Sequence, residues 1–110
     1  MKQYVIDQLR ESDHVLIEKY LNDHGEATAL NEIFWINLPH ELYTSTQKEH
    51  QNCQPYYFAV NLSWTAVAFE FLIRSRQVMR CGCIGYATRE QRDHIMNSAD
   101  RMLQDLGIKV

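Results

Sequence analysis

Cys81 and Cys83 are the residues whose types and spacing are best suited to chemistry in this sequence. They fall in a segment, residues 78–86, that we predict to be a strand. Residues two apart on a strand project from the same face, with Cα atoms about 6.6 Å apart. A disulfide across that distance would be strained and easily reduced. Two thiolates on one face would instead supply half of a tetrahedral zinc site.

His50 and Cys53 are the candidates for the other half of this site. Their spacing of three places both side chains on one face of a short helix or turn. A set of three cysteines and one histidine suits zinc, which is the cofactor that this interpretation implies. The spacing does not repeat the paired CxxC arrangement of zinc modules. Because cysteine is often buried simply as a small apolar side chain, the alternative, which we favour from sequence alone, is that these cysteines are core residues.

Cys81 is also a candidate nucleophile. Arg80 lies beside it, and a predicted helix begins after Thr88, and both features lower a thiol pKa. The nearest histidine along the chain, His94, is the base that such a mechanism needs. At 100° per residue His94 points about 135° away from the apolar stripe of its helix, so we expect it to face solvent. No catalytic residue is therefore assigned, and an enzyme is not the favoured class.

Four residues near the same helix start form a candidate anion-binding site: Arg80, Thr88, Arg89 and Arg92. Free backbone N–H groups at a helix N-terminus attract anions, and the three arginines would add positive charge. The glycines at 82 and 85 do not complete any defined phosphate-binding loop. Ordinary capping of the helix by Thr88 explains the same residues.

Composition and charge exclude several classes of protein. The 110 residues are 45% hydrophobic and 23% charged, which is typical of a folded domain and too apolar for disorder, so we expect one domain over residues 1–110. The net charge is −3, divided between a first part, residues 1–70, of about −6 and a remainder of about +3. A duplex-binding domain normally carries a much stronger basic stripe, so nucleic acid is not an expected partner.

The sequence also predicts the compartment. Asp7 interrupts the first apolar stretch before a signal-peptide core forms, and the most apolar window, 65–73, is too short to span a membrane. Three cysteines is an odd number, whereas secreted domains of this size that depend on disulfides usually carry an even set. We therefore expect a cytoplasmic protein without a membrane segment.

Helical periodicity predicts two main helices. Residues 13–24 place Leu16, Ile17, Tyr20 and Leu21 on one face after an N-cap at Ser12, and Gly25 ends the helix. The second helix begins with a capping box formed by Thr88 and Gln91 and ends at Gly107. A short helix capped by Thr44 or Ser45 is expected to run toward Cys53.

Period-two alternation predicts the strands. Val67, Phe69, Phe71 and Ile73 alternate with smaller or polar residues in the segment 65–74, as expected of a half-buried strand whose odd positions face the core. Further strands are predicted over residues 30–38, 56–61 and 78–86. The segments 56–61, 65–74 and 78–86 are expected to form a three-stranded meander. The fold class is therefore α+β, with two layers: an antiparallel sheet of four to five strands and two main helices packed on one face.

Aromatic residues exceed what two helices can cover. Tyr57, Trp35, Phe58 and Trp64 cannot all lie beneath them, and surplus aromatic surface on a small sheet often forms a dimer interface. The leading functional hypothesis is therefore a non-enzymatic module that binds a protein partner, or itself as a homodimer, through its sheet. A zinc or thiol protein that uses Cys81 and Cys83 with Cys53 and His50 is the alternative.

Overall fold

Alternating apolar residues build an antiparallel sheet around the long strand β4, Tyr56–Leu62. The computed structural model describes residues 2–30 and 32–109. Within them the strand order is β1-β5-β4-β3-β2, and β6 pairs with both β4 and β7. The bounds of the other strands are β1 Gln3–Ile6, β2 Glu26–Ala27, β3 Ile33–Asn37, β5 Val67–Glu70, β6 Leu72–Ser75 and β7 Gly85–Tyr86.

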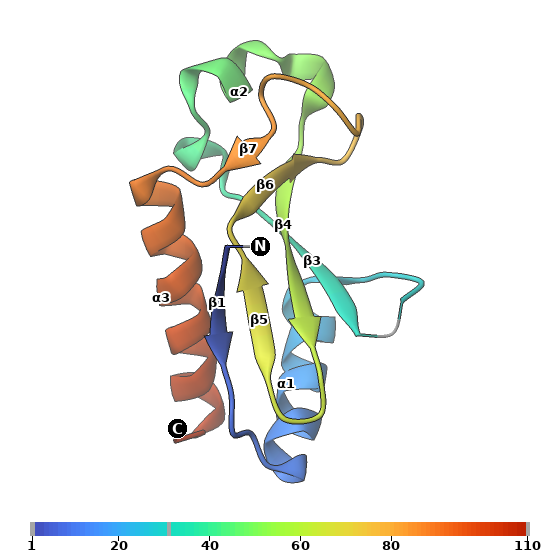
Figure 1. Cartoon of the computed structure of the whole chain (residues 1–110), viewed down its shortest axis with the longest axis vertical. Coiled ribbons are helices and arrows are strands. Elements are labelled where there is room, and N and C mark those ends of the chain that lie inside the picture. The colour runs from blue at the N-terminus through green and yellow to red at the C-terminus, as the bar shows by residue number, and fades with distance from the viewer. Residues whose placement is uncertain (1, 31, 110) are drawn as a thin grey trace.

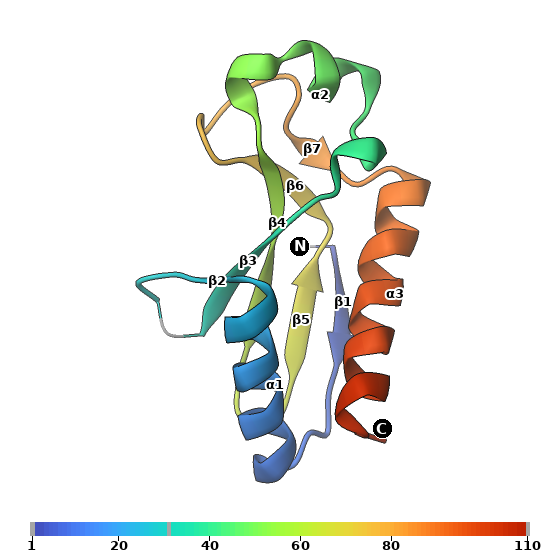
Figure 2. The same cartoon turned by 180° about the vertical axis from the view of Figure 1, so that it is seen from behind.

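Two long helices cover one face of this sheet, as Figure 2 shows from the helical side. They are α1, Glu11–His24, and α3, Arg89–Leu106. Their apolar stripes meet the inward residues of the strands in one core, which includes Ile17, Ile95 and Phe58. The predicted α+β class with an antiparallel sheet is therefore confirmed. None of the helices described is both long enough and apolar enough to cross a bilayer.

The sheet has more strands than the four or five expected. Of the seven strands found in residues 2–30 and 32–109, two, β2 and β7, are only two residues long. The predicted strand 65–74 is divided at Phe71, whose N–H donates to Lys2 O and whose carbonyl accepts from Ala87 N. The chain thus changes partners at Phe71, which separates β5 from β6. The predicted strand 30–38 is shorter, and its residue Asn31 lies outside the described residues.

Two details predicted for α1 are wrong. The helix begins at Glu11 rather than after Ser12, because the carboxylate of Asp13 accepts hydrogen bonds from the backbone N–H and the guanidinium of Arg10. Leu16 is 41% exposed. Ile17 and Leu21 are buried as predicted, and with Asp13 they make up the buried residues of α1, spaced by four.

Figure 1 shows a separate end of the molecule beyond the helical layer, where β4 and β6 extend past α3. We call this end the tip and define it as residues 40–54 and 76–84. It contains α2, Ser45–Glu49, and two short 3₁₀ helices, η1 His40–Leu42 and η2 Gln51–Cys53. Thr44 caps α2, as predicted. The antiparallel pairing of Tyr56 with Ser75 places the two segments of the tip side by side.

Two buried glutamines attach the tip to α3. Gln91 is 1% exposed, and its Nε2 donates to Gln47 Oε1 at 3.0 Å and to Leu42 O at 2.8 Å. Gln47 in turn donates from Nε2 to Cys83 O at 3.3 Å. Both amides also accept a hydrogen bond from the N-cap backbone of their own helix. The two capping boxes therefore meet in one buried network.

Replacing Gln91 by Ala should lower the free energy of unfolding by about 3 kcal/mol, since the substitution leaves several buried polar groups without partners. Denaturant unfolding followed by circular dichroism measures the change. Gln104→Ala on the exposed face of the same helix is the matched control and should change stability by less than about 0.5 kcal/mol. Equal stability of the two variants would contradict the role of the amide network.

Candidate metal centre

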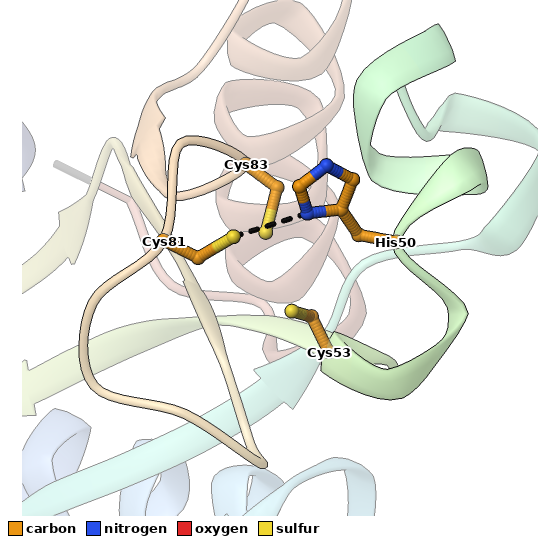
Figure 3. A group of neighbouring side chains, drawn as sticks. All are labelled: His50, Cys53, Cys81 and Cys83. Atoms are coloured by element: carbon orange, nitrogen blue, oxygen red, sulfur yellow. Dashed lines mark hydrogen bonds between the residues drawn. The ribbon is translucent and has the colours of Figure 1, made fainter.

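Four potential metal ligands converge in the tip. Nδ1 of His50 and the Sγ atoms of Cys53, Cys81 and Cys83 all lie within 4.8 Å of one another. Figure 3 shows the three thiols and the imidazole pointing toward a common centre. Zinc–sulfur bonds of about 2.3 Å give an ideal tetrahedron with edges of about 3.8 Å. Small rotations of these side chains would therefore bring all four atoms to bonding distance from one ion.

The first pair of residues is positioned by consecutive turns. His50 ends α2, and Cys53 is the last residue of η2. The N–H of Cys53 donates to His50 O at 2.9 Å, which closes the turn between them. The hydroxyl of buried Tyr56 donates to Gln47 O at 3.2 Å and holds α2 over β4. The prediction that a spacing of three directs both side chains one way is thus confirmed.

The second pair lies on a loop, not on a strand. The predicted strand 78–86 is wrong, because only Gly85–Tyr86 forms a strand. Ser75 turns the chain away from β6 by accepting hydrogen bonds from Gln77 N and Val78 N, at 3.0 and 3.1 Å. Ile84 N then donates to Cys81 O at 3.1 Å and closes a turn that brings both thiols to the same side. The predicted common direction is right, but a turn produces it.

The cluster favours one thiolate, on Cys81. A hydrogen bond from the backbone of Cys83, together with contacts to the Cys83 thiol and His50, lowers the pKa of Cys81 to about 6. His50 Nδ1 lies 3.0 Å from Cys81 Sγ. Burial raises the pKa of Cys53 to about 11, and the neighbouring thiols add to this effect. A negative charge held among sulfur and nitrogen ligands favours a cation.

Burial differs among the three thiols. Cys53 and Cys83 are buried in the core cluster, as the core interpretation expects, whereas Cys81 is half-buried. Burial alone does not explain why all three sulfurs meet beside an imidazole, since an apolar core residue needs no polar partner. The core interpretation therefore accounts for the burial of two cysteines, but not for the convergence of all three beside His50.

The histidine placed to act as a base for Cys81 is not the one predicted. His50 contacts Cys81, whereas His94 is half-buried on α3 next to Ser98. A thiol within hydrogen-bond reach of an imidazole is the arrangement that thiol catalysis uses. Here two further thiols share the same centre, which is the donor set of a metal site.

The four anion-site candidates occupy ordinary surface positions. The hydroxyl of Thr88 accepts from Gln91 N at 3.2 Å and caps α3. Arg89 and Arg92 are exposed on the first turn of α3. Arg80 is exposed on the second segment of the tip, residues 76–84, which we call the tip loop. Capping accounts for Thr88, and anion binding by these residues stays a prediction.

Sequence reasoning missed two residues that support the site. Nε2 of Gln47 donates to the backbone carbonyl of Cys83, and the buried hydroxyl of Ser75 donates to Cys53 O. The capping box formed by Thr44 and Gln47 is a sequence signal that would have found the first. Nothing local marks Ser75, because its partner Cys53 is 22 positions away.

Comparisons of the chain with models of protein families, with curated proteins and with solved structures find no match. What these four side chains can do is therefore inferred from their own chemistry. Three thiols and an imidazole form a closed set of four soft and borderline donors, which suits zinc better than magnesium or calcium.

In protein stripped of metal, iodoacetamide should alkylate Cys81 well before Cys53, since the thiolate is the reactive form. Because the pKa of Cys81 is lowered to about 6, its rate should rise as the pH increases through 6 and level off by neutral pH. Peptide mapping by mass spectrometry measures both rates. Equal rates, or a Cys81 midpoint at the usual thiol value, would contradict this electrostatic picture.

Proposed function

We propose that this chain binds one zinc ion through His50, Cys53, Cys81 and Cys83, and that the ion holds the tip together. The observation that carries the proposal is the convergence of four ligand atoms from two distant segments of the chain. His50 and Cys81, for example, are 31 positions apart yet in contact.

A closed set of four protein ligands is typical of structural zinc, whereas catalytic zinc keeps one position for water. The proposed role is therefore architectural rather than enzymatic. A reducing cytoplasm, the compartment that the sequence predicts, would keep the three thiols available for the metal.

The tip needs such support because its own apolar content is small. Its buried side chains in the segment 40–54 are Tyr43, Gln47 and Cys53, and one of these is polar. In the tip loop, residues 77–80 are all exposed. An ion bound to both segments would supply the cohesion that a larger apolar core supplies elsewhere.

Protein purified without added metal should contain about one equivalent of zinc per chain, and His50→Ala or Cys83→Ser should lose it. Zinc at about a thousand times its Kd should stabilise the wild type by about 4 kcal/mol, which raises Tm on the order of 15 °C. Elemental analysis and thermal unfolding with and without chelator measure the two effects.

His14→Ala is the matched control for loss of an imidazole. His14 stacks on Trp64, and its Nδ1 lies 2.9 Å from Ser63 O, in the turn between β4 and β5 far from the tip. This variant should keep both the zinc and the response to chelator. Less than about a tenth of an equivalent in the wild type after zinc reconstitution would end the proposal and leave the cysteines as core residues.

Self-association through the sheet is a second proposal. Both long helices lie on one face of the sheet, as Figure 2 shows, and we call the opposite face the open face. Trp35 and Tyr57 alternate with the core residues Phe34 and Phe58 and therefore lie on the open face, where Trp35 is half-buried and Tyr57 is buried. Phe58, in contrast, is fully buried in the core, and Trp64 lies on the hairpin turn with 66% of its surface exposed. The aromatic surplus available to a second copy is therefore smaller than the sequence implies.

Light scattering at high micromolar concentration should report a dimer if the open face binds a second copy. Trp35→Ala would then shift the population toward monomer, and Trp64→Ala, outside that face, would not. A wild-type monomer at every concentration would remove this second proposal without affecting the zinc site.

A further inference from the structure

A cavity of about 330 Å³ lies on the open face of the sheet, between β3–β4 and the tip loop. Trp35 and Tyr57 form its aromatic wall, Arg74 and Arg76 contribute cations, and Val78 and Met79 belong to its rim. This volume is at the lower end of the range for small-molecule sites, about 300 to 1,000 Å³. The metal ligands His50, Cys53, Cys81 and Cys83 are not among the described residues that line it.

The aromatic wall is held in place before any ligand arrives. The rings of Trp35 and Tyr57 stack with centroids 4.3 Å apart. The guanidinium of Arg76 lies over both rings, 5.2 and 5.4 Å from their centroids. Nε of Arg76 donates to Asn37 Oδ1 at 2.8 Å, and Nη1 pairs with Glu26. A ligand would therefore meet a rigid surface, which reduces the entropy lost on binding.

Arg74 is the cation with capacity to bind a ligand. Its side chain is 39% exposed, and its Nη2 forms a long ion pair with the buried carboxylate of Glu70, 3.6 Å from Oε1, which is too long for a hydrogen bond. The other N–H groups of the guanidinium can therefore donate to a carboxylate in the cavity while this ion pair is kept. Among the described residues that line the cavity, two are arginines and none is acidic. Carboxylate and phosphate are the two common anions whose oxygens match the planar guanidinium fork.

We propose that this cavity binds a carboxylate carried on an apolar or aromatic body. The carboxylate would pair with Arg74, and the body would pack between the aromatic wall and the rim at Val78 and Met79. Met79 is 95% exposed, so its flexible thioether can fold over a bound group. The apolar walls disfavour phosphate, which has no apolar surface to bury.

The proposed zinc ion would fix the rim, and this part of the inference rests on the proposed function. The hydroxyl of Ser75 donates to Cys53 O and accepts from Gln77 N and Val78 N. One side of the rim is thus bonded directly to the backbone of a metal ligand. The other side continues into Cys81 and Cys83. Zinc would therefore hold both ends of the rim against the sheet and raise the affinity by preorganisation.

Trp35 provides the probe for the test. The chain has two tryptophans, and Trp64 lies in the turn between β4 and β5, away from the cavity. In Trp64→Phe protein, fluorescence therefore reports on the cavity wall alone. Phenylacetate, a carboxylate on an aromatic body, should change the emission saturably with a Kd of about 1 mM, the range for a ligand of ten heavy atoms.

Matched ligands and variants test whether binding depends on the carboxylate and on Arg74. Phenylacetamide, which has the same shape without the charge, should bind at least about tenfold more weakly, and so should phenylacetate to Arg74→Ala. Arg101→Ala, which removes an exposed arginine of α3, should bind like the parent. Tighter binding of N-acetylphenylalanine than of phenylacetate would identify a peptide C-terminus as the source of the carboxylate, and weaker binding a free acid.

Equal responses to phenylacetate and phenylacetamide, unchanged binding by Arg74→Ala, or no saturable response would each overturn the carboxylate site. Titrations with zinc-loaded and chelator-treated protein separate this result from the metal proposal. Binding several-fold weaker after zinc removal supports the link. One equivalent of zinc without phenylacetate binding would overturn the cavity proposal alone. Arg74-dependent binding in protein that takes up no zinc even after reconstitution would overturn the metal proposal and the link, and keep the carboxylate site. Equal binding by zinc-loaded and chelator-treated protein would overturn the link alone.

Discussion

The contact between two buried amides, Gln47 and Gln91, is the interaction on which the arrangement of the tip depends. Each amide uses its oxygen to complete the cap of its own helix, and the pair joins those helices by one hydrogen bond of 3.0 Å. Nε2 of Gln47 donates to Cys83 O at 3.3 Å. In a dry interior such a network is stable only when every member is paired, so the position of α3 determines the position of α2 and of the loop. The sulfur cluster is assembled by this polar contact as much as by apolar packing.

The same arrangement explains why a metal suits this end of the molecule. Apolar residues concentrate where α1 and α3 cover the sheet, and the tip lies beyond that layer. Where β4 and β6 adjoin the tip, they pair at Tyr56↔Ser75 and Tyr57↔Arg74. Metal–ligand bonds are strong and few, so they can replace many weak contacts in a region too small to bury much surface. The proposed ion and the amide network would thus both stabilise the tip.

Periodicity predicted the parts of the fold that bury one continuous face. The stripe of α3, the caps at Thr88 and Thr44, and the alternation that buries Val67, Phe69 and Ile73 were all evident from the sequence. It did not predict the tip loop, where Ser75 redirects the chain by hydrogen bonds that leave no periodic pattern. For the site, the sequence indicated the four residues, but not that His50 contacts Cys81. That contact depends on how two distant segments pack, and spacing along a chain carries no such information.

All three cysteines of the chain meet at a single point. A two-electron oxidant such as a peroxide, which would be reduced to water as two thiols lose their protons, would join two of these sulfurs in a disulfide. One thiol and one imidazole would remain, which are too few ligands to hold a zinc ion. Two molecules of reduced glutathione would reverse that change by thiol–disulfide exchange and leave as glutathione disulfide, with the half-buried Cys81 as the accessible sulfur. The order of the tip would then follow the oxidation state of its environment as well as the supply of metal.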